Sequence, residues 1–347
     1  MRVMVFGAGM TMTGANLVLC RWIEHLAAQG HEILVLPHPR TGGAAGLLAA
    51  RYARAGVRII EPRDAYVDSR TLVICNTIFA AEELIAASAF SRCIWWLHEA
   101  AHGAAILGGA PQLARAFACA SAVIFPAAYL IDGVYRSFLH GLPQEKLHVV
   151  ANGVDVPPLP GERPEGPFRI VTVGTIQDRK RQQDLARAVD ALPDLPLLCQ
   201  MIGQVEELDE DLRRRIEARP DRFQLTGELS HEDTLAAIGA ADILAQPSAG
   251  EALPLAPLEA GIRGKPLVLT NLPVYADIWR HGENCLMHAV GDAGLLAHLL
   301  AILVRDQALR DRFGAAALAT ARRYRSEVML AQLDQIVGRV CPFHLQS

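Results

Sequence analysis

The chain has 347 residues, of which 51% are hydrophobic and 20% are charged, and its formal net charge is -4. This length exceeds the usual size of a single hydrophobic core, so two domains are expected, and the apolar content excludes a disordered protein. The small negative charge gives no reason to expect a nucleic acid or an anionic membrane as partner.

Membrane and export signals are absent from the sequence pattern. The first residues, MRVMVFGAG, lack the apolar core and the small-residue cleavage site of a signal peptide. Every long apolar stretch is broken by Arg, Glu or His before it reaches the roughly 18 residues that span a bilayer. We therefore expect a soluble cytoplasmic protein, with peripheral membrane contact left open but not indicated.

The cysteines predict neither a disulfide framework nor a metal site. They are scattered singly, their number is odd, and no CxxC or Cys/His cluster has the spacing of a zinc site. Most lie within apolar runs, where Cys packs as a small hydrophobic residue. They are Cys20, Cys75, Cys93, Cys119, Cys199, Cys285 and Cys341.

Short apolar runs alternate with amphipathic stretches along the first half of the chain. Arg2 to Phe6 predicts a buried strand, the apolar spacing from Leu19 to Ala27 predicts a helix, and Gly30 ends it. Further strands are predicted at 32–36, 57–60, 71–75, 93–97, 121–125 and 147–151. Buried runs separated by helices indicate a parallel sheet covered on both faces.

The same alternation restarts after a segment that cannot form a regular element. Residues 156–167, VPPLPGERPEGP, contain five prolines and two glycines and are the best linker candidate. Strands are then predicted at 169–174, 197–202, 223–226, 242–246, 266–270 and 284–288.

These patterns predict an α/β protein of two Rossmann-like domains. The expected boundaries are 1–155 for the first domain, 156–167 for the linker and 168–325 for the second domain. The final stretch, 292–340, is predicted to be mainly helical, and a C-terminal helix in 326–347 could either close the second domain or cross back to the first. Ligands of parallel sheets bind beyond the carboxyl ends of the strands, so a cleft between the two domains is the expected site.

The strongest chemical signal is the segment EALPLAPLE, which contains Glu251 and Glu259. Pro254 fits an early helical position, and a helix N-terminus favours an anion such as a diphosphate. Each carboxylate can accept two hydroxyl hydrogen bonds, each worth about 1.5–3 kcal/mol, so sugar or ribose diols are suitable partners. The alternative is that Glu251 caps the helix and Glu259 is an exposed helical residue. The apolar context of Glu259 favours the first interpretation.

This segment, PS-x-x-E-x7-E-A-G-x-x-G-K-P, resembles the signature of the retaining GT-B glycosyltransferases of family 4, the glycosyl transferases group 1. The resemblance implies that Glu251 approaches the transferred sugar and that Glu259 holds the ribose hydroxyls. It also implies that backbone amides around Leu253 and Leu255 touch the donor phosphates.

Two further segments are similar to the family in the expected order. VVANGVD (149–155) looks like the strand and turn before the interdomain linker, and VGTIQDRKRQQDL (173–185) looks like the donor-phosphate loop. There the resemblance implies that Gly174 lies beside the phosphates and that Lys180 neutralises the diphosphate without a metal. The family often has Arg directly after that Gly, where this chain has Thr175; either Arg179 substitutes or diphosphate binding is weaker. Taken alone, the RKR run is the pattern of a solvated helix start.

The first domain carries weaker signals. MTMTGANLVL (10–19) occupies the place of the family's Gly-rich loop, in which Gly14 lets the backbone approach the donor phosphate or the acceptor, although Thr13 replaces a second glycine. Gly7-Ala-Gly9 is part of a dinucleotide fingerprint, but Met12 stands at its third glycine.

Trp95-Trp96-Leu97-His98-Glu99 ends a predicted strand, where the family commonly places a His that contacts sugar. His98 is therefore a candidate for a sugar or acceptor contact, and a packed core His is the alternative. Glu99 is a weaker candidate, and His102 and His140 have no comparable support. FQLTGELSH (223–231) resembles the loop that contacts the donor base, which points to Gly227 and Leu229.

Together these residues predict a glycosyltransferase of the hexosyltransferase type that uses a nucleoside-diphosphate sugar as co-substrate and a hydroxyl-bearing acceptor, with no cofactor and no metal. The resemblance implies retention of the anomeric configuration, with the leaving phosphate helping to deprotonate the acceptor. Three alternatives stay open: a nucleotide-sugar epimerase of the same fold, a catalytically silent nucleotide-sugar-binding partner, and, on the incomplete glycine fingerprint alone, a dehydrogenase.

Overall fold

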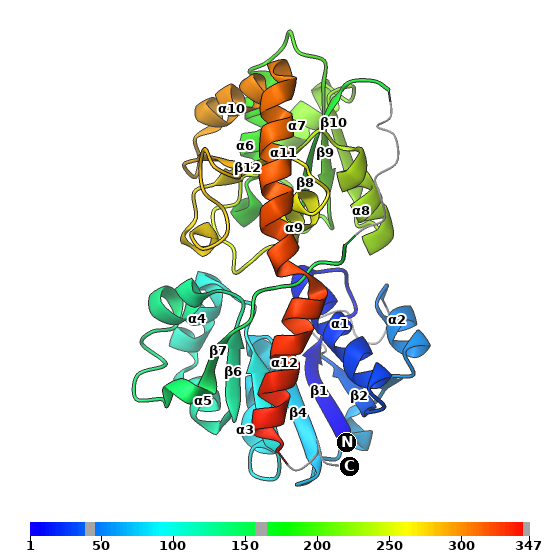
Figure 1. Cartoon of the computed structure of the whole chain (residues 1–347), viewed down its shortest axis with the longest axis vertical. Coiled ribbons are helices and arrows are strands. Elements are labelled where there is room, and N and C mark those ends of the chain that lie inside the picture. Colours follow the sequence, from blue (N-terminus) through cyan, green and yellow to red (C-terminus); the bar gives the residue numbers. More distant parts are fainter. Residues whose placement is uncertain (39–45, 157–164, 343–347) are drawn as a thin grey trace. The chain divides into compact units, whose positions relative to one another are not determined.

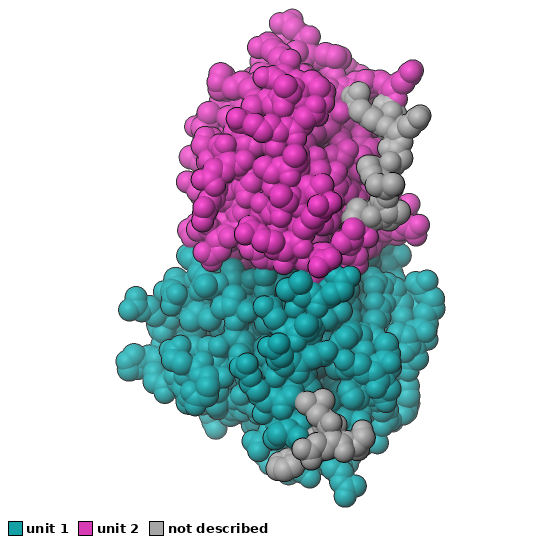
Figure 2. All heavy atoms as spheres, in the orientation of Figure 1, with its two compact units in different colours: residues 1–153, 326–347 teal, residues 154–325 magenta. Residues whose placement is uncertain are grey.

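The computed structural model describes residues 1–38, 46–156 and 165–342. The chain forms two compact units: Met1–Gly153 with Ser326–Ser347, and Val154–Arg325. Figure 2 colours them separately. Most of the linker expected at 156–167 lies outside the described residues. The expectation of a cleft between the domains concerns the placement of the units relative to one another and stays a prediction.

The first unit is built on a parallel sheet of seven strands in the order β3-β2-β1-β4-β5-β6-β7. Its strands are β1 (Arg2–Ala8), β2 (Glu32–Pro37), β3 (Arg58–Ile59), β4 (Thr71–Asn76), β5 (Arg92–Trp96), β6 (Ala122–Phe125) and β7 (Leu147–Val149). The central strands are almost entirely buried because helices cover both faces, which is why their sequences are continuous apolar runs.

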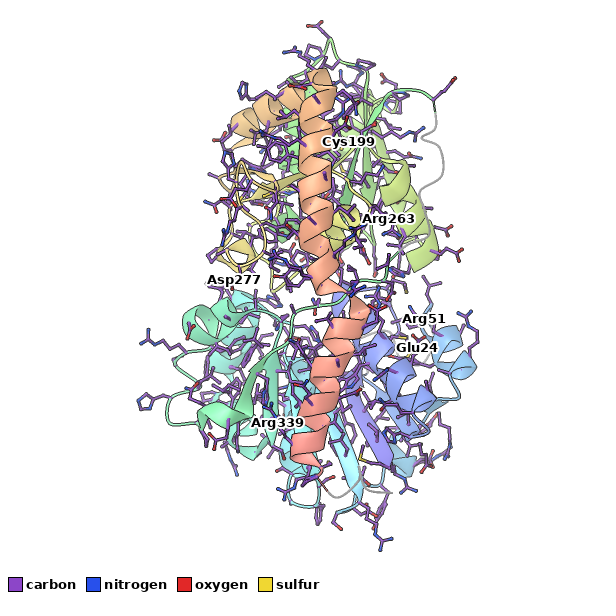
Figure 3. The ribbon with its side chains drawn as sticks, viewed as in Figure 1. Glu24, Arg51, Cys199, Arg263, Asp277 and Arg339 are labelled. Carbon is purple, nitrogen blue, oxygen red and sulfur yellow. The ribbon has the colours of Figure 1, made fainter. Side chains whose placement is uncertain are left out.

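The helices of this unit come from both ends of its sequence. They are α1 (Gly14–Ala28), α2 (Ala49–Arg54), α3 (Ala81–Ala87), α4 (Ala101–Gly109), α5 (Arg115–Cys119) and α12 (Ser326–Val340). Helix α12 packs beside α1 (Figure 1), where Asp334 lies 2.9 Å from the Nε2 atom of His25. Glu24 on α1 pairs with Arg51 on α2 (Figure 3).

The second unit repeats the architecture with a parallel sheet of six strands, in the order β10-β9-β8-β11-β12-β13. Its strands are β8 (Phe168–Val173), β9 (Leu197–Ile202), β10 (Phe223–Gly227), β11 (Ile243–Gln246), β12 (Leu267–Thr270) and β13 (Leu286–His288). Its helices are α6 (Gln182–Asp190), α7 (Glu210–Ala218), α8 (His231–Ala240), α9 (Leu255–Gly261), α10 (Ala293–Arg305) and α11 (Gln307–Ala321).

Both sheets have the strand order of the doubly wound Rossmann fold, which confirms the predicted fold class. In such a sheet the chain reverses its direction of progress between two adjacent strands, and the crevice beyond their carboxyl ends is the usual ligand site. In the second unit these strands are β8 and β11, and in the first unit they are β1 and β4.

All seven cysteines are unpaired, as their scattered positions predicted. Six of them are buried and one, Cys119, is partly exposed. Burial raises the pKa of Cys20, Cys93, Cys199 and Cys285 to about 12, so these thiols are inert packing groups.

Candidate functional site

The loops after β8 and β11 meet at the switch point of the second unit. The loop after β8 contains a short 3-10 turn, η7 (Asp178–Lys180), and Glu251 lies in the segment between β11 and α9. The Nζ atom of Lys180 donates to Oε1 of Glu251 over 2.7 Å. The fold therefore joins two residues that the sequence placed in different motifs.

Glu251 is buried among cationic and polar groups, with 7% of its surface exposed. Arg179 lies 3.5 Å from its Oε2 atom and also donates to the carbonyl oxygen of Gly250. Burial alone raises the pKa of Glu251, but the charges of Lys180 and Arg179 outweigh burial and hold that pKa below its ordinary value. Glu251 is thus an ionised, buried carboxylate, and no side chain caps α9.

A buried network of polar groups holds the segment between β11 and α9 that contains Glu251. The Nε2 atom of Gln246 lies 3.0 Å from Ser248 Oγ and 3.5 Å from Glu251 Oε1. The hydroxyl of Thr270, at the end of β12, lies within hydrogen-bond distance of the carbonyl oxygens of Gln246 and Ser248. Such contacts fix the loop that presents Glu251.

Two glycines let the loops of the second unit approach closely. Gly174 directly follows β8 and has a φ of 145°, and the end of the Lys180 side chain packs against it. Gly203 directly follows β9 and has a φ of 150°, and a Cβ there would collide with the carbonyl group of Gly174. The carbonyl oxygen of Thr175 accepts from the Gln182 amide at 3.0 Å. The phosphate-loop candidates Gly174, Thr175, Arg179 and Lys180 therefore form one folded turn.

The three cations of the RKR run do not share one partner. Arg179 and Lys180 contact Glu251, whereas Arg181 pairs with the buried Asp184, with Nε 2.5 Å from Oδ2. Arg181 begins α6 with a φ of 53°, a left-handed conformation that is uncommon outside glycine. Of the three residues in this run, only Arg181 stands at the start of a helix, as the N-cap of α6.

The second acidic residue of the motif, Glu259, lies on α9 and is 4% exposed, so it is not the exposed helical residue of the alternative interpretation. Its Oε1 atom lies 2.8 Å from Nε2 of His231, the first residue of α8. His231 is the last residue of the segment that resembles the base loop, and that resemblance implies no role for it. Its place at the first helical position, directly after Ser230, a residue type typical of an N-cap, is the signal in the sequence.

The remaining candidates of the second unit lie at the starts of α9 and α8. Helix α9 begins at Leu255, so Pro254 occupies the N-cap position with extended backbone, one residue earlier than a helical position. The side chains of Leu253 and Leu255 are buried. Gly227 ends β10 with a φ of 73° and accepts from the Gly203 amide at 2.9 Å, and Leu229 is partly exposed.

In the first unit, Gly14 is the exposed first residue of α1, directly beyond β1. Thr13, which replaces the family's second glycine, is the N-cap, and its hydroxyl accepts from the Asn16 amide at 3.4 Å. The Gly9 amide donates to the Asn16 side chain at 3.0 Å, where a Cβ on residue 9 would collide. The side chains of Thr13 and Asn16 therefore hold the loop between β1 and α1 in a fixed conformation.

His98 follows β5 and packs against Trp96, with 4.7 Å between the ring centres and the two rings tilted by 42°. Burial lowers the pKa of His98 to about 3, so its imidazole is neutral, and its Nε2 atom has no partner among the described residues. Next to it, burial raises the pKa of Glu99 to about 7. The Glu99 carboxyl group accepts from the amides of Ile78 and His98, each at 3.1 Å. Glu99 thereby ties the loops after β4 and β5 together.

Among residues 1–38, 46–156 and 165–342, no group of three or more His, Cys, Asp or Glu side chains is arranged to hold a metal ion. No described helix combines the length and the apolar character needed to cross a bilayer.

Much of the second unit is similar to a known family. Residues 160–320 match the family model "Glycosyl transferases group 1". The chain is 30% identical over 160 residues to phosphatidyl-myo-inositol mannosyltransferase of Mycobacterium leprae, covering 44% of this chain and 42% of the relative. It is 29% identical over 199 residues to glycogen synthase of Mycobacterium tuberculosis, covering 55% of this chain and 47% of the relative. The matches thus span less than half the length of these relatives.

Solved structures resemble the whole chain. The structure of Anabaena HepE in complex with UDP and glucose has a TM-score of 0.81 at 19% identity, covering 98% of this chain and 100% of that one. A glycosyltransferase from Rickettsia africae ESF-5 has a TM-score of 0.73 at 14% identity, covering 99% of both chains. At these identities the likeness concerns the fold, which is GT-B.

Proposed function

We propose that the protein is a retaining glycosyltransferase of family 4, which moves a sugar from a nucleoside-diphosphate sugar to a hydroxyl group of a glycan, a glycolipid or a small molecule. The observation that carries this proposal is the ion pair between Lys180 and the buried Glu251 at the switch point of the second unit. Both residues lie within the stretch that matches the glycosyl transferases group 1 model.

The charges of this cluster suit a diphosphate. Lys180 and Arg179 contribute two positive charges and Glu251 one negative charge, so the three side chains have a net charge of +1. An ammonium group has three N–H donors, so Lys180 can hold Glu251 and still donate to a phosphate oxygen. In this proposal Lys180 stabilises the charge that develops on the leaving diphosphate.

In this proposal Arg179 takes the place of the Arg that the family often has directly after the glycine, where this chain has Thr175. Its guanidinium group lies against Gly250 and Glu251, in the same cluster as Lys180. Arg179 therefore supplies the cation that the family often carries directly after the glycine. Substitution of Arg179 by Gln is expected to weaken binding of a nucleoside diphosphate about tenfold, as loss of one charge-assisted hydrogen bond would.

The reaction breaks the bond between the anomeric carbon and the diphosphate oxygen, and the acceptor oxygen forms its bond on the same face of the sugar. The acceptor's proton passes to an oxygen of the leaving phosphate. Glu251 orients a hydroxyl of the transferred sugar, Glu259 holds the ribose hydroxyls, and the amides at the start of α9 around Leu253 and Leu255 receive the phosphates. Gly227 and Leu229 line the base.

No metal is needed in this scheme because Lys180 and Arg179 provide the counter-charge for the diphosphate. We therefore expect that an excess of EDTA leaves the rate of sugar transfer unchanged. A loss of transfer that added Mg²⁺ or Mn²⁺ restores would contradict metal independence while leaving the transferase assignment intact.

The test of the function starts with UDP-sugars, since UDP and glucose occupy the structure of Anabaena HepE. UDP release is measured with UDP-glucose and related donors, with and without a panel of hydroxyl acceptors, and NMR gives the anomer of the product. Transfer with retention supports the proposal, and an inverted product contradicts the mechanism. Conversion of the donor alone indicates an epimerase, and saturable donor binding without turnover on any acceptor indicates a silent binding partner.

A further inference from the structure

We infer that His231 is a positioning residue for the donor, which holds the Glu259 carboxylate in the orientation that accepts the ribose hydroxyls. This inference rests on the proposed function, because it takes the role of Glu259 from there. The inference adds His231, on α8, to the proposed site and specifies the ribose as the part of the donor whose binding it controls.

The contact is short and is sheltered from water. Nε2 of His231 lies 2.8 Å from Oε1 of Glu259, and the two side chains are 17% and 6% exposed. A carboxylate only accepts hydrogen bonds, so Nε2 of His231 carries a hydrogen atom and donates a hydrogen bond to Glu259. A hydrogen bond to a charged group at such a site fixes the rotamer of the carboxylate.

The two helices do not depend on this contact for their own ends. Helix α8 is capped by Ser230, whose hydroxyl accepts from the Asp233 amide at 3.1 Å. Beyond α9, Arg263 (labelled in Figure 3) donates to the backbone carbonyl of Glu259 at 3.0 Å. The His231 side chain therefore acts on the Glu259 side chain rather than on the helix ends, and its removal leaves both of these contacts in place.

The chemistry of the pair matches recognition of a vicinal diol. An oxygen of a carboxylate has two acceptor directions, so Oε1 can accept from His231 and from a hydroxyl at the same time. Without the His231 contact the Glu259 carboxylate samples more orientations, and ordering it on binding costs part of the binding free energy. His231 thus pre-organises Glu259 for the ribose, and the effect is confined to ligands that carry ribose hydroxyls.

The experiment compares two ligands that differ only in those hydroxyls. Dissociation constants of UDP and of 2′,3′-dideoxy-UDP are measured by calorimetry for the whole chain and for His231→Ala, His231→Gln and Glu232→Ala. Glu232 is the exposed next residue of α8 and serves as the matched control. Gln can place an amide N–H near the position of Nε2.

The wild-type chain is expected to prefer UDP by about tenfold to a hundredfold, as loss of hydrogen bonds to a carboxylate would cause. In His231→Ala this preference is expected to fall to about threefold. The affinity for the dideoxy ligand changes by less than about twofold, which a general loss of structure would not allow. His231→Gln restores most of the preference and Glu232→Ala leaves it unchanged.

Retention of the full preference in His231→Ala would overturn the inference. So would an equal loss of affinity for both ligands, because His231 would then act on the fold or on another part of the donor. If the wild-type chain prefers UDP strongly but transfers no sugar, the proposed function fails while the role of His231 stands. If UDP does not bind to the wild-type chain, both the UDP donor and this role are refuted.

Discussion

Lys180 and Glu251 are separated by 71 positions in the sequence, yet their charged groups are 2.7 Å apart in the folded second unit. Each is largely buried, with 11% of the Lys180 side chain and 6% of the Glu251 side chain exposed. A buried charge that loses its partner is costly to the fold. This pair therefore connects the stability of the unit to the chemistry proposed for it.

Replacement of Lys180 by Met should affect both properties. We expect about 2–3 kcal/mol lower stability, less than the 3–5 kcal/mol typical of a broken buried pair because Arg179 still faces Glu251, and a loss of sugar transfer of about a hundredfold or more. Urea unfolding and initial transfer rates measure the two effects. The double variant Lys180→Met/Glu251→Gln should regain stability but not activity. A double variant as unstable as Lys180→Met would show that the two groups do not interact.

Glu251 should also give the unit a characteristic acid sensitivity. Because its pKa in the folded state lies below the ordinary value of about 4.5, its contribution to stability is present above pH 4.5 and is lost as the pH falls through the folded pKa. The stability difference between the wild-type chain and Glu251→Gln should therefore shrink below about pH 4.5. Urea unfolding of both proteins between pH 3.5 and 7 checks this. A constant difference would mean that Glu251 is not held ionised.

Glu99 should produce the opposite dependence in the first unit. Its pKa is raised from 4.5 to about 7, so the folded state binds more protons than the unfolded state between these values, and stability falls as the pH rises through them. The loss amounts to roughly 3–4 kcal/mol and levels off above pH 7. Glu99→Gln, which cannot titrate, should lack this decline. Parallel pH profiles for the two proteins would contradict the shift.

Gly203 should tolerate no side chain. In Gly203→Ala the new methyl group would meet the carbonyl group of Gly174, and the φ of 150° is unfavourable for alanine. We expect a loss of more than about 2 kcal/mol and weaker nucleotide binding, because the loop that carries Lys180 is displaced. Gly239→Ala is the control, since it lies in α8 with open space around it and should stabilise by about 0.5–1 kcal/mol. Thermal unfolding and UDP titration compare the two variants.

The sheets could be predicted from the sequence because strands buried on both faces are continuous apolar runs. Each predicted strand overlaps an observed one, for example 71–75 with β4 and 197–202 with β9. The positions of Glu251 and Glu259 in a loop and on a helix also followed from local pattern. The contacts of these residues did not, since they depend on packing between distant segments.

Three features of the structure had no local signal in the sequence. Arg181 takes a left-handed conformation because its pair with the buried Asp184 outweighs the backbone preference. Thr77 has a φ of 69° because it is held by the Trp95 indole at 2.8 Å and by the Trp96 carbonyl at 2.9 Å. The meeting of His231 and Glu259 requires α8 and α9 to be packed together. Sequence periodicity specifies none of these.

The membership of α12 in the first unit affects how the chain can fold during its synthesis. Residues of the second unit are all translated before Ser326–Val340 leave the ribosome. A chain that ends at Arg325 contains the whole second unit but leaves exposed the surface of α1 that α12 covers. Such a truncated chain, once released from the ribosome, should be more sensitive to protease in residues 1–153 than the full chain, with the second unit equally resistant in both.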